Sequence, residues 1–288
     1  MRLFSYKGSG TQIILLTIIH ISFHVSMIYG LMHYSLHWLW LTVIGTILIR
    51  HVGSQIGGHR YYAHRSFETK PWKEWLMSLC IVCSYGGSHL RWVPGHCFHH
   101  RYSDQACDNH SPHHIKNIRD FIRVGWPPMI FFRKMFNSET DKIRINKFME
   151  YFREENYFKH LYRNPAVRFS HRYYWLIAFI PLVILPIIDI RLLIYLIAIP
   201  CVINGWNLFF INFFGHLSTF GGYRNYKVDV HGNKDHSTNS PWLNLVTGGE
   251  GMQNNHHRYP RAYNFKMSDK WHETDFLNTF LIEKFFKV

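Results

Sequence analysis

The sequence is poor in acidic residues and in cysteine. It carries 18 aspartates and glutamates against 32 lysines and arginines, which gives a formal net charge of +14. Such a charge suits nucleic acid, an anionic lipid surface or an acidic carrier, and it cannot by itself choose among them. Of the five cysteines, only Cys80 and Cys83 form a CxxC pair, which lies in an apolar stretch with no second pair nearby. Packed thiols are therefore favoured over a zinc or redox site.

Charge is absent from two long blocks. No Asp, Glu, Lys or Arg occurs from Gly8 to Ile49, which is long enough for two spanning helices of about 20 residues each. A second block runs from Tyr173 to Tyr223 and is interrupted only by Asp189 and Arg191. The first block lacks the cleavage site of a signal peptide, so both blocks are interpreted as permanent membrane helices. We predict four transmembrane helices in two hairpins, at about residues 11–32, 37–56, 173–189 and 192–214.

The remaining segments are expected on one side of the membrane. The uncharged patch from Trp75 to Leu90 is apolar over about half a span only, so we expect it at the interface. Then 31 of the 32 lysines and arginines share one side, with Arg191 the exception, and the positive-inside tendency makes that side cytoplasmic. The expected fold is all-α, a single membrane domain over residues 1–288 in which residues 57–172 and 215–288 form a cytoplasmic helical cap.

The basic and aromatic residues outside the spans are expected to contact the bilayer. The segment from Trp126 to Lys134 is predicted to be an interfacial anchor. The lysines and arginines of the tail are expected to meet anionic lipid, and nucleic acid is not expected as a partner.

Histidine occurs 22 times, and its clearest groups each follow or abut a predicted membrane exit. These groups are His59 with His64, His96 with His99 and His100, His216 four residues after Asn212, and His256 with His257. Gln253 precedes the last pair with the spacing that His96 has to His99 and His100. On a helix, the three histidines of the second group span an arc of about 100°, so their imidazoles can converge on one point.

Such crowding indicates a metal site. Neutral imidazole is a ligand suited to iron, copper or zinc, and eight histidines exceed what one metal needs but suffice for two. An isolated histidine pair more often caps or hydrogen-bonds, but three clusters on one side of a membrane are rare by chance. The intramembrane pair His20 and His24 could also bind a metal, yet hydrogen bonding within the bundle is favoured.

These residues resemble the histidine boxes of the integral-membrane fatty acid desaturase family, closest to the delta-9 type that acts on acyl-CoA or acyl-lipid. His59 and His64 match the first box, His-x4-His, and Trp92 with the three histidines after it matches the second. The stretch from Asp235 to Pro260 is similar to the segment around the third box. An Asn-x-x-x-His sequence after the fourth span is matched as well.

The resemblance implies a di-iron centre that uses O2 and two electrons to remove hydrogens from adjacent methylenes. In the family, nine histidines bind the irons and an asparagine contacts one metal through water. The matching ligands here would be His59, His64, His96, His99, His100, His216, His256 and His257, with Asn212 as the water-mediated contact. Gln253 stands in place of the ninth histidine, as in front-end desaturases, and we expect it to be a weak ligand or to lie beside the metals, because an amide oxygen is a poorer donor than imidazole.

The expected function is a fatty-acyl desaturase whose substrate is carried by CoA, by acyl-carrier protein or in a lipid. The same scaffold could instead hydroxylate or form an acetylenic bond. A histidine-rich metal transporter is a further alternative, although transporters place ligands near the bilayer midplane. With no dinucleotide glycine fingerprint, electrons are expected from a separate ferredoxin or cytochrome b5-like donor. We expect a bacterial inner membrane protein with its N-terminus, active site and C-terminus cytoplasmic.

Overall fold

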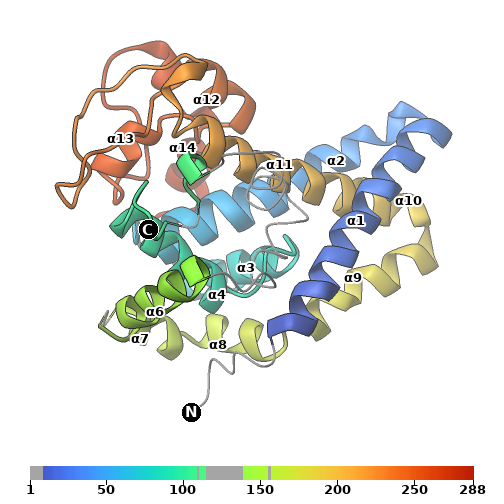
Figure 1. Cartoon of the computed structure of the whole chain (residues 1–288). Coiled ribbons are helices and arrows are strands. Elements are labelled where there is room, and N and C mark those ends of the chain that lie inside the picture. Colours follow the sequence, from blue (N-terminus) through green and yellow to red (C-terminus); the bar gives the residue numbers. More distant parts are fainter. Residues whose placement is uncertain (1–8, 109, 115–138, 155–156) are drawn as a thin grey trace.

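The computed structural model describes residues 9–108, 110–114, 139–154 and 157–288 (Figure 1). Within these ranges the chain is helical, and extended pairing is limited to isolated β-bridges. The expected all-α fold is therefore confirmed for the described part of the chain. The segment from Trp126 to Lys134, predicted to be an interfacial anchor, lies outside it.

The elements follow one another from the membrane helices to the short helices of the tail. They are α1 (Ser9–His33), η2 (Leu36–Trp38), α2 (Leu39–Thr46), η3 (Ile47–Ala63), α3 (Pro71–Val82), α4 (His89–Arg101), η4 (Pro112–His114), α6 (Glu139–Glu154), α7 (Tyr157–Arg163), α8 (Pro165–Arg172), α9 (Tyr174–Ile188), α10 (Ile190–Leu192), η7 (Leu193–Ala198), α11 (Ile199–Phe214), η8 (Ser218–Phe220), α12 (Pro241–Thr247), α13 (Gln253–Arg258), η9 (Trp271–Glu273), α14 (Phe276–Leu281) and η10 (Ile282–Phe286).

Three helices of the described chain are long and apolar enough to cross a membrane: Ile14–His33, Leu36–Ala63 and Ile190–Phe214. The second continues to Ala63, past the predicted end at residue 56. The predicted span at 173–189 corresponds to α9, whose 15 residues reach only about 22 Å at 1.5 Å per residue. Because α9 bends by 65° from α8, these two helices make a fourth span only if they are taken together.

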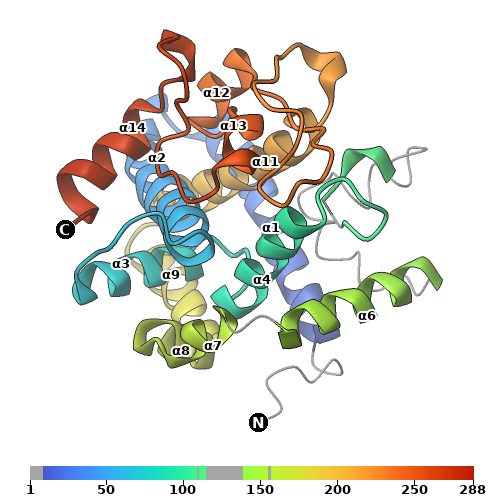
Figure 2. The same cartoon turned by 90° about the vertical axis from the view of Figure 1, so that its left-hand side faces the viewer.

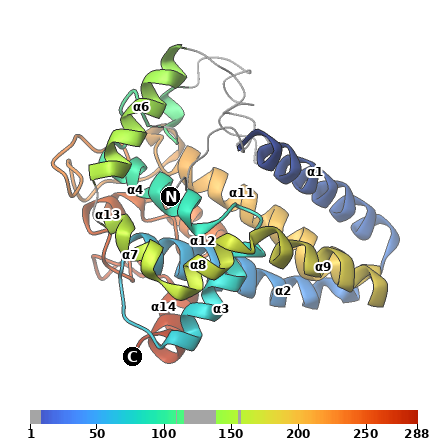
Figure 3. The same ribbon diagram turned by 90° about the horizontal axis from the view of Figure 1, so that it is seen from below.

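The membrane helices α1, α2, α9 and α11 extend together to one side of the molecule (Figure 3). α1 packs on α11 and η7, and α2 lies against the same two elements. Their outward side chains are apolar: Val25, Leu176 and Ile187 are 61%, 62% and 75% exposed. An apolar surface of this extent is typical of a membrane-facing protein.

Histidines inside this bundle are bonded to protein groups, as predicted. A ring nitrogen of His20 lies 3.1 Å from the carbonyl oxygen of Tyr85. His24 pairs through Nδ1 with the carbonyl of His20 at 2.7 Å, and its Nε2 accepts the indole N–H of Trp206 at 3.1 Å. These bonds tie α1 to α11 and to the turn before α4.

α3 lies close against η3 because two glycines of η3 face it. A Cβ at Gly53 would lie 2.8 Å from the carbonyl oxygen of Cys80, and one at Gly57 would lie 3.0 Å from the Cβ of Met77. Small residues four apart allow such close helix packing in membranes. α3 has 12 residues, too few to span a bilayer, which agrees with the interfacial segment expected there. Cys80 and Cys83 are free thiols packed in apolar clusters, as predicted.

We call the end of η3 from residue 59 on, residues 64–108 with α3 and α4, the helices α6 and α7, and residues 215–288 the polar half of the molecule. The short tail helices α12, α13 and α14 gather at one end of it (Figures 1 and 2). Its last residues pair with the segment before α3: Thr69 donates to the Phe286 carbonyl at 2.6 Å, and the Val288 N–H donates to the Glu68 carbonyl at 3.1 Å. The tail thereby closes over the end of η3.

Candidate metal centre

The end of η3 carries the first two histidines. π-Helical hydrogen bonds join residues five apart, and the N–H of His64 donates to the carbonyl of His59 at 3.2 Å. The two side chains therefore lie on the same side of the helix, with ring centroids 5.0 Å apart. The His-x4-His spacing is thus one turn of this wider helix.

The other histidines come from α4, α13 and the loop that follows α11. α4 supplies His96, His99 and His100, as the helical spacing predicted. α13 has only six residues, too few to be stable as an isolated helix, and it is held by buried asparagines. Asn255 donates to the Phe265 carbonyl at 2.9 Å and Asn239 accepts the Asn255 N–H at 3.0 Å.

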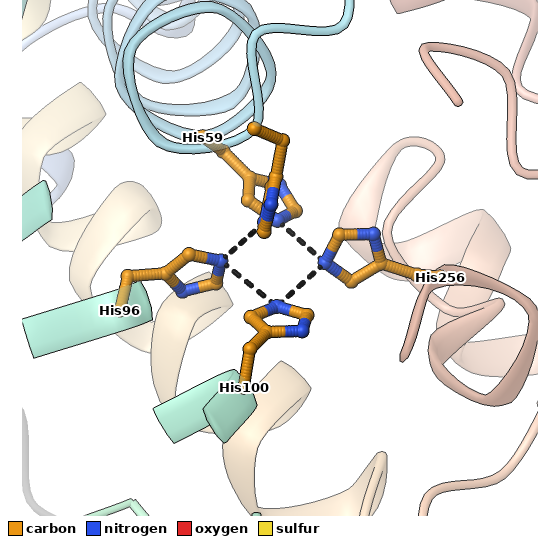
Figure 4. A group of neighbouring side chains, drawn as sticks. His59, His96, His100 and His256 are labelled. Atoms are coloured by element: carbon orange, nitrogen blue, oxygen red, sulfur yellow. Dashed lines mark hydrogen bonds between the residues drawn. The ribbon is translucent and has the colours of Figure 1, made fainter. Parts of the chain in front are cut away.

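Five histidines form the first group, which we call site A. One nitrogen of each lies within 4.8 Å of the others. His59 lies in η3 and His64 directly follows it, while the rest come from α4 and α13. The five are His59, His64, His96, His100 and His256. Neighbouring Nε2 atoms are 2.8 Å apart for His59 and His256, 3.0 Å for His256 and His100, 3.1 Å for His100 and His96, and 2.8 Å for His96 and His64. The Nε2 atoms thus face one another around a common point (Figure 4).

Three further histidines, His99, His216 and His257, form the second group, site B. Their ring centroids are 4.8 to 5.2 Å apart. Site B adjoins site A, because the rings of His100 and His257 have centroids 4.4 Å apart. All three imidazoles of site B are buried.

Carboxylates lie within hydrogen-bond distance of the outward nitrogens of three of these histidines. His99 Nδ1 lies 2.8 Å from Asp108, and His216 Nδ1 lies 2.9 Å from Asp104. His59 Nδ1 lies 3.0 Å from Glu250. A carboxylate at Nδ1 holds the proton on that nitrogen and leaves Nε2 as a lone-pair donor, the arrangement found behind metal-bound histidines.

A buried arginine supports one of these carboxylates. Arg60 is fully buried and pairs with Glu250 and, at 2.8 Å, with Asp275, while its guanidinium lies 4.2 Å from the centre of the Phe265 ring. Burial alone would raise the pKa of Glu250, but Arg60 and His59 lower it to about 2. Glu250 is therefore a carboxylate at physiological pH.

Five of the imidazoles are held in the neutral form, which is the form that binds metals. Burial, and then the neighbouring histidines, hold the pKa of each well below its ordinary value in His64, His96, His100, His256 and His257. His216 differs: burial lowers its pKa, but Asp104 more than offsets this and raises the pKa. The anion beside His216 thus makes that imidazole the more basic donor.

The donor set fits two metal ions. His216 Nε2 and His257 Nε2 are buried without a hydrogen-bond partner among the described residues. Buried polar atoms are normally paired, so unpaired nitrogens that face the same space need a partner of another kind. A metal ion bound by imidazole satisfies both, and the ring of Nε2 atoms in site A offers a second such position.

A small cavity lies beside site A between η3, the turn before α4 and α11. Its walls include Gly58, Trp92, Val93 and Leu208, and its volume is about 20 Å³, room for about one water. The indole of Trp92 stacks on His96 with ring centroids 4.9 Å apart. The cavity therefore adjoins site A through the indole of Trp92.

Comparison with known sequences decides what kind of protein this is. The sequence profile of fatty acid desaturases matches residues 36–276. The chain belongs to the fatty acid desaturase family. It is a membrane-embedded oxidoreductase, a fatty-acyl desaturase, and not the histidine-rich metal transporter considered as an alternative.

Similar proteins include two lipid desaturases and an acetylenase whose names state their substrates. The sn-1 stearoyl-lipid 9-desaturase of Anabaena variabilis is 25% identical over 272 residues, which are 90% of this chain and 85% of that protein. The sn-2 palmitoyl-lipid 9-desaturase of Nostoc sp. (strain 36) is 28% identical over 227 residues, 78% of this chain and 68% of that one. The hex-5-enoyl-[acyl-carrier protein] acetylenase of Moorena producens is 26% identical over 245 residues, covering 81% and 70%.

The desaturase structure brings all eight predicted histidines together and places Gln253 next to them. The Gln253 side chain is buried against Gly215, where a Cβ would lie 2.8 Å from its Cγ, and its amide donates to the Glu250 carbonyl at 2.7 Å. Because Gly215 precedes His216, this position adjoins site B. Asn212 is half-buried in the last turn of α11.

Sequence reasoning missed the charged residues behind the histidines. They are Arg60, Asp104, Asp108, Asp235, Glu250 and Asp275. A signal for them existed, because acidic residues are scarce in this chain and several of them lie within ten residues of a histidine group.

Proposed function

We propose that the protein is an O2-dependent di-iron desaturase that introduces a double bond into the acyl chain of a membrane lipid. The observation that carries this is the convergence of eight histidines, from four distant parts of the sequence, into two buried groups at the end of membrane helices. Neutral imidazoles in such number suit iron, and a fatty acid desaturase needs an oxidant strong enough to attack an unactivated C–H bond.

In this proposal each group holds one iron. Site A supplies five imidazoles and site B three, with Gln253 as a weak ligand or close neighbour of site B and Asn212 as a contact through water. When bound, the irons supply the redox chemistry by which O2, two electrons and two protons convert two adjacent methylenes into an alkene and two waters. The remaining tasks fall to the chain's own residues.

Those residues fix the donors and exclude bulk water. Asp104, Asp108 and Glu250 hold the Nδ1 protons of three histidines, so that the Nε2 lone pairs point inward. Burial of the histidines keeps solvent away from a reactive centre. The acyl chain approaches along the cavity beside Trp92, which must widen for it by movement of side chains such as Leu208.

A lipid is the proposed carrier of the acyl group. The stearoyl-lipid and palmitoyl-lipid 9-desaturases are similar over most of this chain. Acyl-CoA and acyl-carrier protein are the other carriers to be tested. Hydroxylation or acetylene formation is the alternative outcome of the same chemistry. Because an acetylenase of Moorena producens is similar to this chain, the product analysis should also look for an acetylenic acyl chain.

We propose that electrons come from a separate ferredoxin or cytochrome b5-like protein. The sequence has no second CxxC pair and no dinucleotide fingerprint that would serve as a built-in donor. In this proposal, the separate donor supplies the two electrons of each turnover.

The proposed topology has two helical hairpins and a cytoplasmic cap. η2 and α10, which connect the helices of the two hairpins, meet, because the guanidinium of Arg191 lies 4.3 Å from the centre of the Trp38 ring. From Trp38, the helix to His59 is long enough, at about 1.5 Å per residue, to cross a hydrocarbon core of about 30 Å. The metal centre and both termini then share the opposite, cytoplasmic side, in a bacterial inner membrane and in one domain over residues 1–288.

Single-cysteine labelling tests this topology. Glu68→Cys and Lys227→Cys should react with an impermeant reagent from the same side, and His37→Cys from the other, while the native thiols are largely buried. Labelling of Glu68→Cys and Lys227→Cys from opposite sides would contradict a shared metal centre.

Expression in a host without its own desaturase, followed by mass spectrometry of its lipids, tests the function. We expect a new monounsaturated acyl chain in intact lipids and close to two irons per purified chain. Hydroxylated or acetylenic products would overturn the desaturation outcome, and product found only on CoA or acyl-carrier protein would overturn the lipid carrier.

A further inference from the structure

Site B has fewer imidazoles than site A but more carboxylates behind them. Both hydrogen-bonded aspartates serve site B: Asp108 on His99 and Asp104 on His216. The third imidazole, His257, has Asp235 at 3.7 Å from its Nδ1, an ion-pair distance too long for a direct hydrogen bond. In site A, only His59 has a carboxylate partner among the described residues.

Among the described residues, none of the three aspartates pairs with a lysine or an arginine. Their side chains are 0% or 1% exposed, and in the described part of the chain their partners are histidines, hydroxyls, amides and backbone N–H groups. Glu250 of site A is instead paired with Arg60. Buried carboxylates without a cation are unfavourable, so the three carboxylates around site B favour a positive charge bound between these histidines.

The loop after α4 is built to aim two of these carboxylates. Asp104 has a φ of 59°, in the left-handed region that few non-glycine residues adopt and that aspartate tolerates. Its N–H donates to Asp108 at 2.9 Å, and its carboxylate accepts the Ser111 hydroxyl at 2.7 Å. One short loop thus orients the two carboxylates toward imidazoles from α4 and from the end of α11.

We propose that Asp104 and Asp108 are positioning residues that compensate site B for its missing fourth imidazole. By holding protons on Nδ1 they fix the Nε2 lone pairs of His99 and His216, and together with Asp235 they provide the negative charge that favours a multivalent cation there. Site A, with five imidazoles and a neutralised carboxylate, does not depend on them. The inference rests on the proposed function only in that two metals bind.

Asparagine substitutions separate charge from shape. In Asp104→Asn and Asp108→Asn, Oδ1 can still accept the Nδ1–H bond, but the negative charge is lost. Anaerobic equilibrium dialysis of the purified full chain with Fe(II) should show the weaker of two sites bound about 10 to 100-fold less tightly, as is typical when a residue behind a metal ligand is changed. Asp269→Asn, in an exposed part of the tail, is the matched control and should leave both affinities unchanged.

Mössbauer spectroscopy of protein loaded with ⁵⁷Fe assigns the effect to one site. The unaltered protein should give two iron signals of equal area, and the double variant Asp104→Asn, Asp108→Asn should lose only the one that His216→Ala also loses. Unchanged affinity of the weaker site, or equal loss of both signals with a lower melting temperature of the metal-free protein, would overturn the proposal. A single iron in the unaltered protein would instead refute the two-iron function itself.

Discussion

The membrane helices and the polar half are stabilised in different ways. The helices rest on apolar contacts, close approaches at glycine and a few bonds such as that from Trp206 to His24. The polar half buries charges, including Arg60, Asp104, Asp108 and Glu250, around the two histidine groups. Apolar packing is complete without any other component, whereas buried charges are favourable only when every partner is present. Substitutions in the two regions should therefore differ in kind as well as in size.

The largest effect is expected from His100→Ala. His100 is the imidazole that joins the two sites, with Nε2 3.0 Å from His256 and its ring 4.4 Å from that of His257. Its loss should abolish turnover and lower the iron content, measured by lipid analysis and by inductively coupled plasma spectrometry. The matched bundle variant, His24→Ala, loses a bond to Trp206 worth about 1 kcal/mol and should keep its iron. Full turnover in His100→Ala would show that this histidine is not a ligand.

Arg60→Met should cost the most stability. It leaves Glu250 and Asp275 buried without their cation, and breaking a buried ion pair costs about 3 to 5 kcal/mol. Denaturant unfolding in detergent, followed by tryptophan fluorescence, measures the change. Arg261→Met, on an exposed arginine, serves as the control. A loss below about 1 kcal/mol in Arg60→Met would mean that the two carboxyl groups are satisfied without the arginine.

Gln253→Ala should weaken iron binding at site B by about 10-fold or more, because it removes the side chain packed against Gly215, the residue before His216. Gln253→His should retain iron and can shift the position of the double bond. Iron titration and product analysis measure the two effects. Gln253→Ala with unaltered iron content and product would leave a centre of eight histidines with the glutamine as a hydrogen-bonding neighbour only.

Gly53→Ala, in the membrane bundle, should give the smallest effect. The added Cβ would lie 2.8 Å from the Cys80 carbonyl, and overpacking of this kind costs about 1 to 3 kcal/mol. The melting temperature should fall while the iron content stays the same. Gly95→Ala, where a Cβ meets nothing within 4 Å, is the control for stability. Loss of iron in Gly53→Ala would show that the bundle and the metal centre are coupled more closely than their packing indicates.

Much of the fold was predictable because its signals are local. Charge-free runs located α1, α2 and α11, and the spacing of His96, His99 and His100 predicted a helix that the structure confirms. The bounds of the third span were predicted less exactly. Pro165 starts a separate helix, and the bend at Tyr173 depends on tertiary packing, which a hydropathy pattern does not show.

The site could be predicted as a set of histidines but not as two groups. His99 and His100 are neighbours in sequence, yet they belong to different sites because consecutive side chains on a helix point about 100° apart. The pairing of Asp104 with His216 joins residues from distant segments. Such a contact follows from tertiary folding, and a single sequence does not contain it.

The ion pair between Arg60 and Asp275 also bears on the order of events during biosynthesis, because its two residues are synthesised far apart in time. A chain grows by about 5 to 20 residues per second, so roughly 10 to 40 s separate the synthesis of His59 from that of Asp275. During most of that interval Arg60 lacks both of its carboxylate partners, and the histidines of α13 that complete the two sites with those of α4 have not been synthesised. Iron that arrives early meets an incomplete set of ligands, so productive metal loading follows translation of the tail and does not accompany membrane insertion.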